Sequence, residues 1–476
     1  MRGPVLGMAA LILLGGCVSH QGEDRGADAP HPAALHAICA ADAVLPSHGI
    51  GICTQVLAPA QDREREASIA AHPTDPNTIL VTWRNGELDA ATSIEAAYTN
   101  DAGAHWAFTA LHDPALPAMP FQYTYSWDST ARFGPEGTGY ILYGGEQHRT
   151  DLPGGAVATP DYRMTLAATR DGKTWTYHSF DDGPAALATS ADYMDLAVAP
   201  DTGRLVVVAY ADAVPPAVAA PTSAPEGIWS WTSDDHGATW STPTIADREI
   251  SSSPQDPFAA SEQTNPRVLA GPGGLVLLTT NTLGPLANLT SGCHPCSGVS
   301  GVLTISHDGG TSWGEPRPIY QYSDPDGFLF NDPSSIWTDA TGLHAALVYG
   351  ENGNVTGLRS DDGGLTWTAP VHLAATPPGT RHVFLRAEAR DAGVWASYRW
   401  GSNDPPRFGA SILHWTPSGV ENLTVADWPS NGIPTGRTGY GDDYGAVAVT
   451  SDGTAWMAFA DGESGGERVR VAHVAP

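Results

Sequence analysis

Carboxylate side chains recur in this sequence a few residues ahead of short apolar runs. Carboxylate oxygens are ligands that Ca²⁺ prefers in proteins, and they also accept hydrogen bonds from sugar hydroxyl groups. Asp and Glu bind backbone amides of their own loops as well, so a structural role is the alternative. We therefore predict either a calcium or sugar site, or a set of loop caps, at Glu66, Asp192, Asp195, Asp332, Asp442 and Asp443.

A second acidic pattern is a phrase of eight residues, which reads SDDGGLTW at positions 360–367. Its carboxylate accepts bonds from turn amides, its glycine takes positive φ, and its tryptophan buries a ring beneath the turn. Because equivalent turns cannot share one active site, the phrase indicates architecture and not catalysis. Its five copies lie at positions 99–106, 169–175, 233–240, 306–313 and 360–367.

This phrase resembles the Asp-box, or BNR repeat, of the sialidase superfamily. Members of that superfamily are β-propellers with the box between the third and fourth strands of a blade. They include glycosidases, binding modules and assembly factors, so the resemblance points to the fold more than to an activity. Exported bacterial Asp-box propellers also open with a Glu-x-Ser-Ile phrase, as at Glu66, and close with a Gly-Asp-Tyr phrase, as near Tyr444.

The number of blades follows from the second strand of each unit, which is a short apolar run ending in an aromatic or polar residue. Seven such runs predict an all-β, seven-bladed β-propeller, with six blades as the alternative because sialidase catalytic domains usually have six. The last unit ends after three strands, so we expect residues 53–57 to supply its fourth strand and close the ring. The runs are 79–83, 140–143, 205–210, 275–280, 343–349, 394–398 and 456–459.

The resemblance also implies where a ligand would bind. In such propellers the ligand face consists of the loops that enter each inner strand and the loops between second and third strands. The longest insertions here, at 144–161, 213–227 and 281–300, fall in those loops. We therefore expect blades two to four to carry a raised rim.

A sialidase would need an arginine cluster, an acid that donates a proton, and a Tyr nucleophile with a Glu partner. Arg65 holds the place of the family's first arginine, although the Ile-Pro that follows it in the family is missing. Asp89, or less well Glu87, matches the proton donor by position. The remaining positions that the resemblance implies are Glu262, Arg381, Arg437, Tyr440 and Tyr444.

The N-terminus has the features of an export signal. An apolar stretch at 5–14 follows Arg2 and is too short to remain as a membrane span. The sequence LGGC at 14–17 resembles a bacterial lipobox, which implies cleavage before Cys17 and lipid attachment there. We predict a lipoprotein signal peptide at 1–16, a tether at 17–50 and a propeller at 51–476, exported to the periplasm or cell surface.

Four further cysteines are expected to form disulfides because the protein is exported. A bond between Cys39 and Cys53 would reinforce the ring seam, and one between Cys293 and Cys296 would close a small loop. A zinc site made by all four is the alternative.

Composition limits the possible partners. The 476 residues include 53 Gly and 39 Pro, and only 16% are charged, which is typical of an all-β domain with many turns. The formal net charge of −29 argues against nucleic acid, and it leaves the lipid anchor as the only contact with a membrane. We expect a monomer that binds an extracellular ligand, a glycan above all, with a sialidase-type glycoside hydrolase as the alternative.

Overall fold

The computed structural model divides the chain into two units, Met1–Leu35 and His36–Pro476. Among the residues that the structure describes, no helix has the length and apolar character of a membrane span. For some residues near strand ends, including Arg65, Asp192 and Arg381, the structure describes the backbone but not the side chain. The structure describes residues 52–57, 64–85, 93–111, 124–147, 161–181, 191–211, 227–248, 263–283, 298–323, 335–339, 342–351, 354–390, 393–403, 406–429, 446–460 and 469–474.

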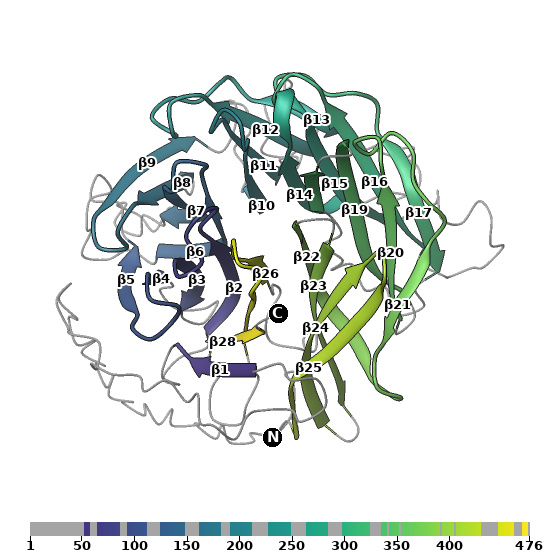
Figure 1. Cartoon of the computed structure of the whole chain (residues 1–476). Helices are drawn as coiled ribbons and strands as arrows, with labels where there is room; N and C mark the ends of the chain where they lie inside the picture. Colours follow the sequence, from purple (N-terminus) through teal and green to yellow (C-terminus); the bar gives the residue numbers. More distant parts are fainter. Residues whose placement is uncertain are drawn as a thin grey trace, which may run out of the picture. The chain divides into compact units, whose positions relative to one another are not determined.

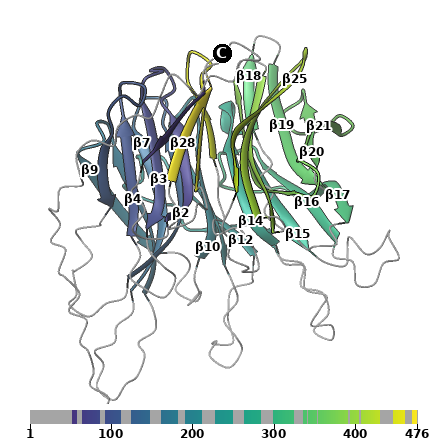
Figure 2. The same ribbon diagram turned by 90° about the horizontal axis from the view of Figure 1, so that it is seen from below.

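Seven four-stranded antiparallel sheets form the blades of a β-propeller, which confirms the predicted fold and blade number (Figure 1). In blades one to six the strands follow chain order from the inner to the outer edge. Figure 2 shows the blades from the side, with their strands aligned roughly along one axis and neighbouring strands antiparallel. Blade one contains β2 (Glu64–Ala71), β3 (Ile79–Asn85), β4 (Ser93–Thr99) and β5 (Ala107–Leu111); blade two contains β6 (Thr124–Phe133), β7 (Gly139–Gln147), β8 (Asp161–Thr169) and β9 (Trp175–Asp181); blade three contains β10 (Ala191–Val198), β11 (Leu205–Ala211), β12 (Gly227–Ser233) and β13 (Thr244–Arg248).

The next three blades repeat this order, and one short 3-10 turn, η1 (Pro272–Gly274), joins the first two strands of blade four. Blade four contains β14 (Gln263–Ala270), β15 (Val276–Leu283), β16 (Gly298–Ser306) and β17 (Arg317–Ser323); blade five contains β18 (Ser335–Asp339), β19 (Gly342–Glu351), β20 (Asn354–Ser360) and β21 (Val371–Ala375); blade six contains β22 (Arg381–Arg390), β23 (Gly393–Asn403), β24 (Pro406–Thr416) and β25 (Gly419–Pro429).

Blade seven is built from both ends of the propeller, as the sequence predicts. Three strands come from the C-terminal part, namely β26 (Ala446–Val449), β27 (Ala455–Ala460) and β28 (Val469–Val474), and the fourth is β1 (Ile52–Val56). β1 pairs antiparallel with β28, and the backbone N–H of Leu57 donates to the carbonyl of Val469 at 2.9 Å. The ring is therefore closed by backbone hydrogen bonds between its ends.

Arg390 reinforces this closure at the far end of β22. Its guanidinium donates to the carbonyl of Val449 in blade seven and to that of Pro73 in blade one, both at 3.1 Å. One side chain therefore ties three blades together. The apolar core spans the same seam, because Trp83 of β3 and Trp456 of β27 belong to one buried cluster.

The turns that carry the repeated eight-residue phrase, called box turns below, are held together by their own hydrogen bonds, as the residue types predict. In blade three, Ser233 Oγ donates to Asp235 Oδ1 at 2.9 Å and accepts from the N–H of Gly237 at 2.9 Å. The side chain and backbone of Thr239 both donate to Asp235, and these bonds lower the pKa of that carboxyl to about 2. Gly237 has a φ of 88°, where a larger residue would be strained. The Asp therefore has a structural role in the turn.

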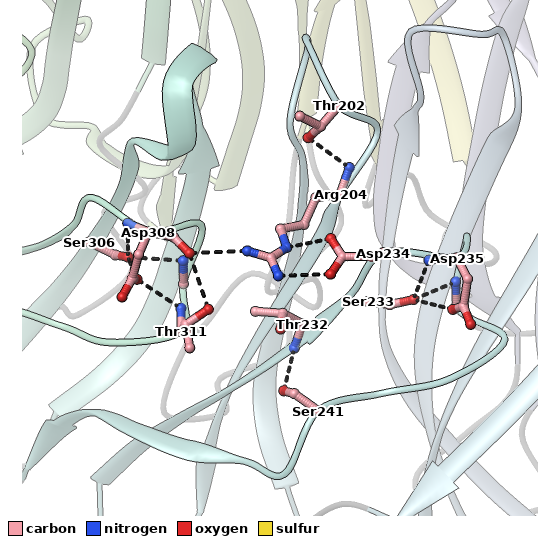
Figure 3. Close-up of polar contacts among 12 residues, drawn as sticks. Thr202, Arg204, Thr232, Ser233, Asp234, Asp235, Ser241, Ser306, Asp308 and Thr311 are labelled. Atoms are coloured by element: carbon pink, nitrogen blue, oxygen red, sulfur yellow. Dashed lines mark hydrogen bonds and ion pairs between the residues drawn. The ribbon is translucent and has the colours of Figure 1, made fainter.

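An ion pair links two neighbouring boxes. Arg204, which directly precedes β11, donates from Nε and Nη2 to the carboxylate of Asp234 at 2.7 and 2.9 Å. Its Nη1 donates to the carbonyl of Asp308 at 3.0 Å, so Arg204 lies between the boxes of blades three and four (Figure 3). The box ends of these blades are thereby fixed to each other.

Replacing Trp240 by alanine is expected to lower the free energy of unfolding by about 3 kcal/mol, near the low end for large aromatic truncations. The ring is only partly buried, but it stacks on Phe180 with centroids 4.2 Å apart. Urea denaturation would measure the loss, with Trp240→Phe as the milder control. Binding of a ligand at the opposite end of the propeller should not change. Loss of binding at unchanged stability would show that the box has a functional role.

Candidate ligand site in the central channel

Most residues predicted to act at a site lie outside the described part of the chain. Arg65, Asp192 and Arg381 lie on β2, β10 and β22, near the beginnings of three inner strands, where only their backbone is described. Cys53 lies likewise on β1. Glu66 and Asp195 are the predicted site residues whose side chains can be placed. Those outside the described residues are Cys17, Cys39, Asp89, Glu262, Cys293, Cys296, Asp332, Arg437, Tyr440, Asp442, Asp443 and Tyr444, with Glu87.

The inner strands share a β-bulge near their beginning. The bulges fall in blades one, two, three, four and six, and each inserts an extra residue that redirects the side chains that follow. At the bulge, Glu66, Asp128 and Tyr193 have φ values of 59°, 45° and 50°, which cost free energy in residues with a Cβ. The first paired residues after the bulges are Ser68, Thr130, Asp195, Arg267 and Arg386.

Buried carboxylates at these bulges connect one blade to the next. Glu66 pairs with Arg84 of its own blade at 2.7 Å and accepts from the N–H of Asp128 in blade two at 3.0 Å. Asp128 in turn accepts from the N–H of Tyr193 in blade three at 2.6 Å. Glu66 therefore connects its own strand to the neighbouring blade, and these contacts help to hold the strained backbone at the bulges.

A cavity of about 230 Å³ lies between the inner strands. β2, β6, β10, β14, β22 and β26 all line it, mostly with small or aliphatic residues. Its volume is below the roughly 300–1,000 Å³ of typical ligand pockets, so it fits a small group and not a whole oligosaccharide. The polar and charged side chains that line it are those of Ser68, Arg132, Asp195, Arg267, Arg386 and Glu388.

Asp195 is the centre of this charged cluster, and its side chain is only 1% exposed. Arg132 Nη2 lies 3.0 Å from Asp195 Oδ1, and Arg267 Nη1 lies 4.0 Å from the same oxygen. The hydroxyl of Thr130 and the N–H of Val268 donate to the carboxylate, each at 3.1 Å. Burial favours the neutral acid, but the nearby arginines Arg132, Arg267 and Arg386 outweigh it and hold the pKa of Asp195 below its usual value. The carboxylate is therefore ionised and links blades two, three and four.

Glu388 lies two residues beyond Arg386, so both side chains project from the same face of β22. Burial between the channel walls raises the pKa of Glu388 to about 7, although a backbone hydrogen bond from Val449 and the charges of Arg132 and Arg390 oppose the shift. Three arginines and the carboxylate of Asp195, which is ionised at neutral pH, thus face the cavity together with Glu388, which titrates near neutrality. The lining carries net positive charge inside a chain whose formal net charge is −29. This arrangement suits an anionic group.

Glu388→Gln is expected to stabilise the protein by about 1–3 kcal/mol at pH 8 and to change little near pH 4. Because the folded-state pKa is raised from 4.5 to about 7, the folded chain retains a proton that the unfolded chain loses between these values. The stability that Glu388 contributes is complete below pH 4.5 and is lost as the pH rises through about 7. Gln cannot ionise, so it avoids that loss. Thermal melts of the wild type and of Glu388→Gln at pH 4 and pH 8 test this. The same difference in melting temperature at both pH values would contradict it.

The arginines of the channel were not among the predicted site residues. A signal for them does exist, because Arg132, Arg267 and Arg386 each stand between two apolar residues of an inner strand. Among the described residues no group of three or more His, Cys, Asp or Glu side chains could hold a metal ion. Calcium binding by the other predicted carboxylates stays a prediction.

Comparison with known proteins gives structural neighbours alone. No protein family gives a match to the sequence, and no curated protein does either. An ulvan lyase of polysaccharide lyase family PL25 is 12% identical, covers 87% of this chain and 94% of its own, and has a TM-score of 0.49. The GH93 α-L-arabinofuranosidase of Fusarium graminearum is 13% identical, covers 88% of this chain and 96% of its own, and has a TM-score of 0.48. A Hadza microbial sialidase is 14% identical, covers 83% of this chain and 75% of its own, and has a TM-score of 0.44. These identities are too low to transfer an activity.

Proposed function

We propose that this protein is an exported propeller, anchored through lipid on Cys17, that recognises an acidic glycan at the loop face. The observation that carries the proposal is the set of three arginines, Arg132, Arg267 and Arg386, which reach one channel cavity from blades two, four and six. Guanidinium groups bind carboxylates through paired hydrogen bonds, and the walls of the cavity strengthen that attraction. The cavity would receive the acidic group of the ligand while the surrounding loops contact its sugar rings.

The resemblance found in the sequence implies that a ligand binds at the loop face. An inner strand begins at the end opposite the box turn, because the box follows the third strand of an antiparallel blade. Asp195, Arg267 and Arg386 lie near the middle of their strands, and Arg132 is the second-last residue of β6. The charged cluster therefore lies deep in the channel, and the acidic group of a ligand that enters from the loop face would have to reach past the beginnings of the inner strands.

Calorimetric titration of the mature protein with glucuronate, N-acetylneuraminate and neutral glucose would test the proposal. We expect the acids to bind and glucose to bind at least about tenfold more weakly, because one charged hydrogen-bonded pair is worth more than that factor. Arg386→Gln should weaken acid binding. Arg407→Gln is the matched control, since Arg407 lies in the same blade and pairs with Asp427 on the outer strand. Equal binding of acids and glucose, or no binding, would refute the proposal.

Glycoside hydrolysis is the second candidate function. Arg65 directly precedes the bulge of β2, and Arg381 is the first residue of β22, so their backbones lie near the beginnings of inner strands, as a sialidase would require. The wild-type protein would then release sialic acid from sialosides, with and without added calcium. Asp89→Asn should slow substrates with poor leaving groups most, because it removes the proton donor. Binding without release in the wild type would assign a recognition role.

A further inference from the structure

Glu388 faces the same cavity as the arginines but does not pair with them as Asp195 does. It lies deeper in the channel than Arg386 by about 7 Å, the rise of two strand residues. Arg132 approaches from the opposite wall, and its guanidinium is held by Asp195 and by the carbonyl of Ala131 at 2.8 Å. A change in the charge of Glu388 therefore acts on the arginines without breaking their direct bonds.

Few other titratable groups face Glu388. β26, which packs beside β22, has only Ala446–Val449 and contributes the Val449 backbone N–H. On β23 and β19, which also pack against β22, the described ionisable side chains other than tyrosine are Arg399 and His344, and neither lines the cavity. The charged groups that face Glu388 from β6, β10, β14 and β22 are Arg132, Asp195, Arg267, Arg386 and Arg390.

We propose that Glu388 makes carboxylate binding in the channel depend on pH, so that an acidic ligand binds more tightly in mildly acidic solution. The inference rests on the proposed function, because it assumes that an anion binds at the arginines. An ionised Glu388 attracts the guanidinium groups and repels the ligand, whereas a neutral Glu388 does neither. Since the pKa of Glu388 is about 7, its charge changes within the pH range that an exported protein meets.

Binding and protonation must favour each other to the same degree. A bound carboxylate stabilises the neutral form of Glu388 and raises its pKa. The protein should therefore take up a fraction of a proton when a sugar acid binds near pH 7. Calorimetry in two buffers with different ionisation enthalpies measures this uptake directly, and a residue that only supports the fold would not produce it.

The test compares glucuronate binding by the wild type and by Glu388→Gln at pH 6 and pH 8. Glucuronate stays ionised across this range, so the ligand does not change its charge. For the wild type we expect about tenfold tighter binding at pH 6, the effect of removing one partly screened unit charge roughly 7 Å away. Glu388→Gln should bind tightly at both pH values and take up no proton. Glu421→Gln, a change at an exposed residue of the outer strand β25, should behave as the wild type.

Three results would overturn the inference. If the wild type binds glucuronate with the same affinity at both pH values, the pH dependence is refuted while the proposed function stands. The same conclusion follows if Glu388→Gln keeps the tenfold difference or the proton uptake. If the wild type binds no glucuronate at either pH, the proposed function fails and this inference fails with it.

Discussion

Asp195→Ala is expected to lower the free energy of unfolding by about 3–5 kcal/mol, because it removes the counter-charge from the buried Arg267 and the partly buried Arg132. It also removes the acceptor for the N–H of Val268. Urea denaturation at pH 7 measures the effect. The matched control is Asp234→Ala, whose side chain is 72% exposed in its pair with Arg204, so that loss should stay below about 1 kcal/mol.

Asp195→Asn separates the lost charge from the lost hydrogen bonds. Because the pKa of Asp195 is lowered in the folded state, its charge stabilises the wild type above the ordinary Asp pKa. That stability is lost as the pH falls through the folded-state pKa. The difference in the free energy of unfolding between the wild type and Asp195→Asn should therefore become smaller as the pH is lowered. A gap that is constant with pH, or an Ala variant as stable as the Asp234 control, would show that Asp195 does not hold the cluster together.

Removing residues 1–57 is expected to cost more than removing residues 1–50, which leaves β1 in place. The longer deletion removes the strand that pairs with β28, and it removes Leu57, which is 1% exposed in the core of the seam. With each backbone bond worth about 1 kcal/mol, the loss should be several kcal/mol, and the exposed edge should promote aggregation. Differential scanning calorimetry and light scattering compare the two. Equal melting temperatures of the two deletion variants would mean that β1 does not close the ring.

The fold could be predicted from the sequence because its repeats carry their own turn chemistry. Ser, Asp, Gly and Trp at fixed spacing specify a hairpin turn without help from the rest of the chain. The seven apolar runs then give the number of blades, and all seven lie on the second strands β3, β7, β11, β15, β19, β23 and β27. In blade six the sequence TPSG at 416–419 lacks the Asp and Trp of the box, and the turn there joins β24 directly to β25.

The channel site could not be predicted in the same way. Alternation along a strand assigns side chains to its two faces, but a bulge reverses that assignment for every residue after it. Nothing in the residues around Asp195 marks a bulge as the box marks a turn. Near Arg267 the one signal is Pro266, because a strand interior accepts proline mainly at a bulge. The convergence of Arg132, Arg267 and Arg386 depends on three such positions in three blades, so the tertiary structure was needed to see it.

Closure by β1 has a consequence for how the protein is made. β1 leaves the ribosome early, but its partner β28 follows only after residues 57–468 have been synthesised. At about 5–20 residues per second, this leaves β1 without its partner for tens of seconds. During the export proposed above, the unpaired edge could pair with another chain, so holding the N-terminal segment away from other copies would protect the yield of folded protein. A lipid anchor at Cys17 would keep early and late parts of one chain close together at the membrane while the ring closes.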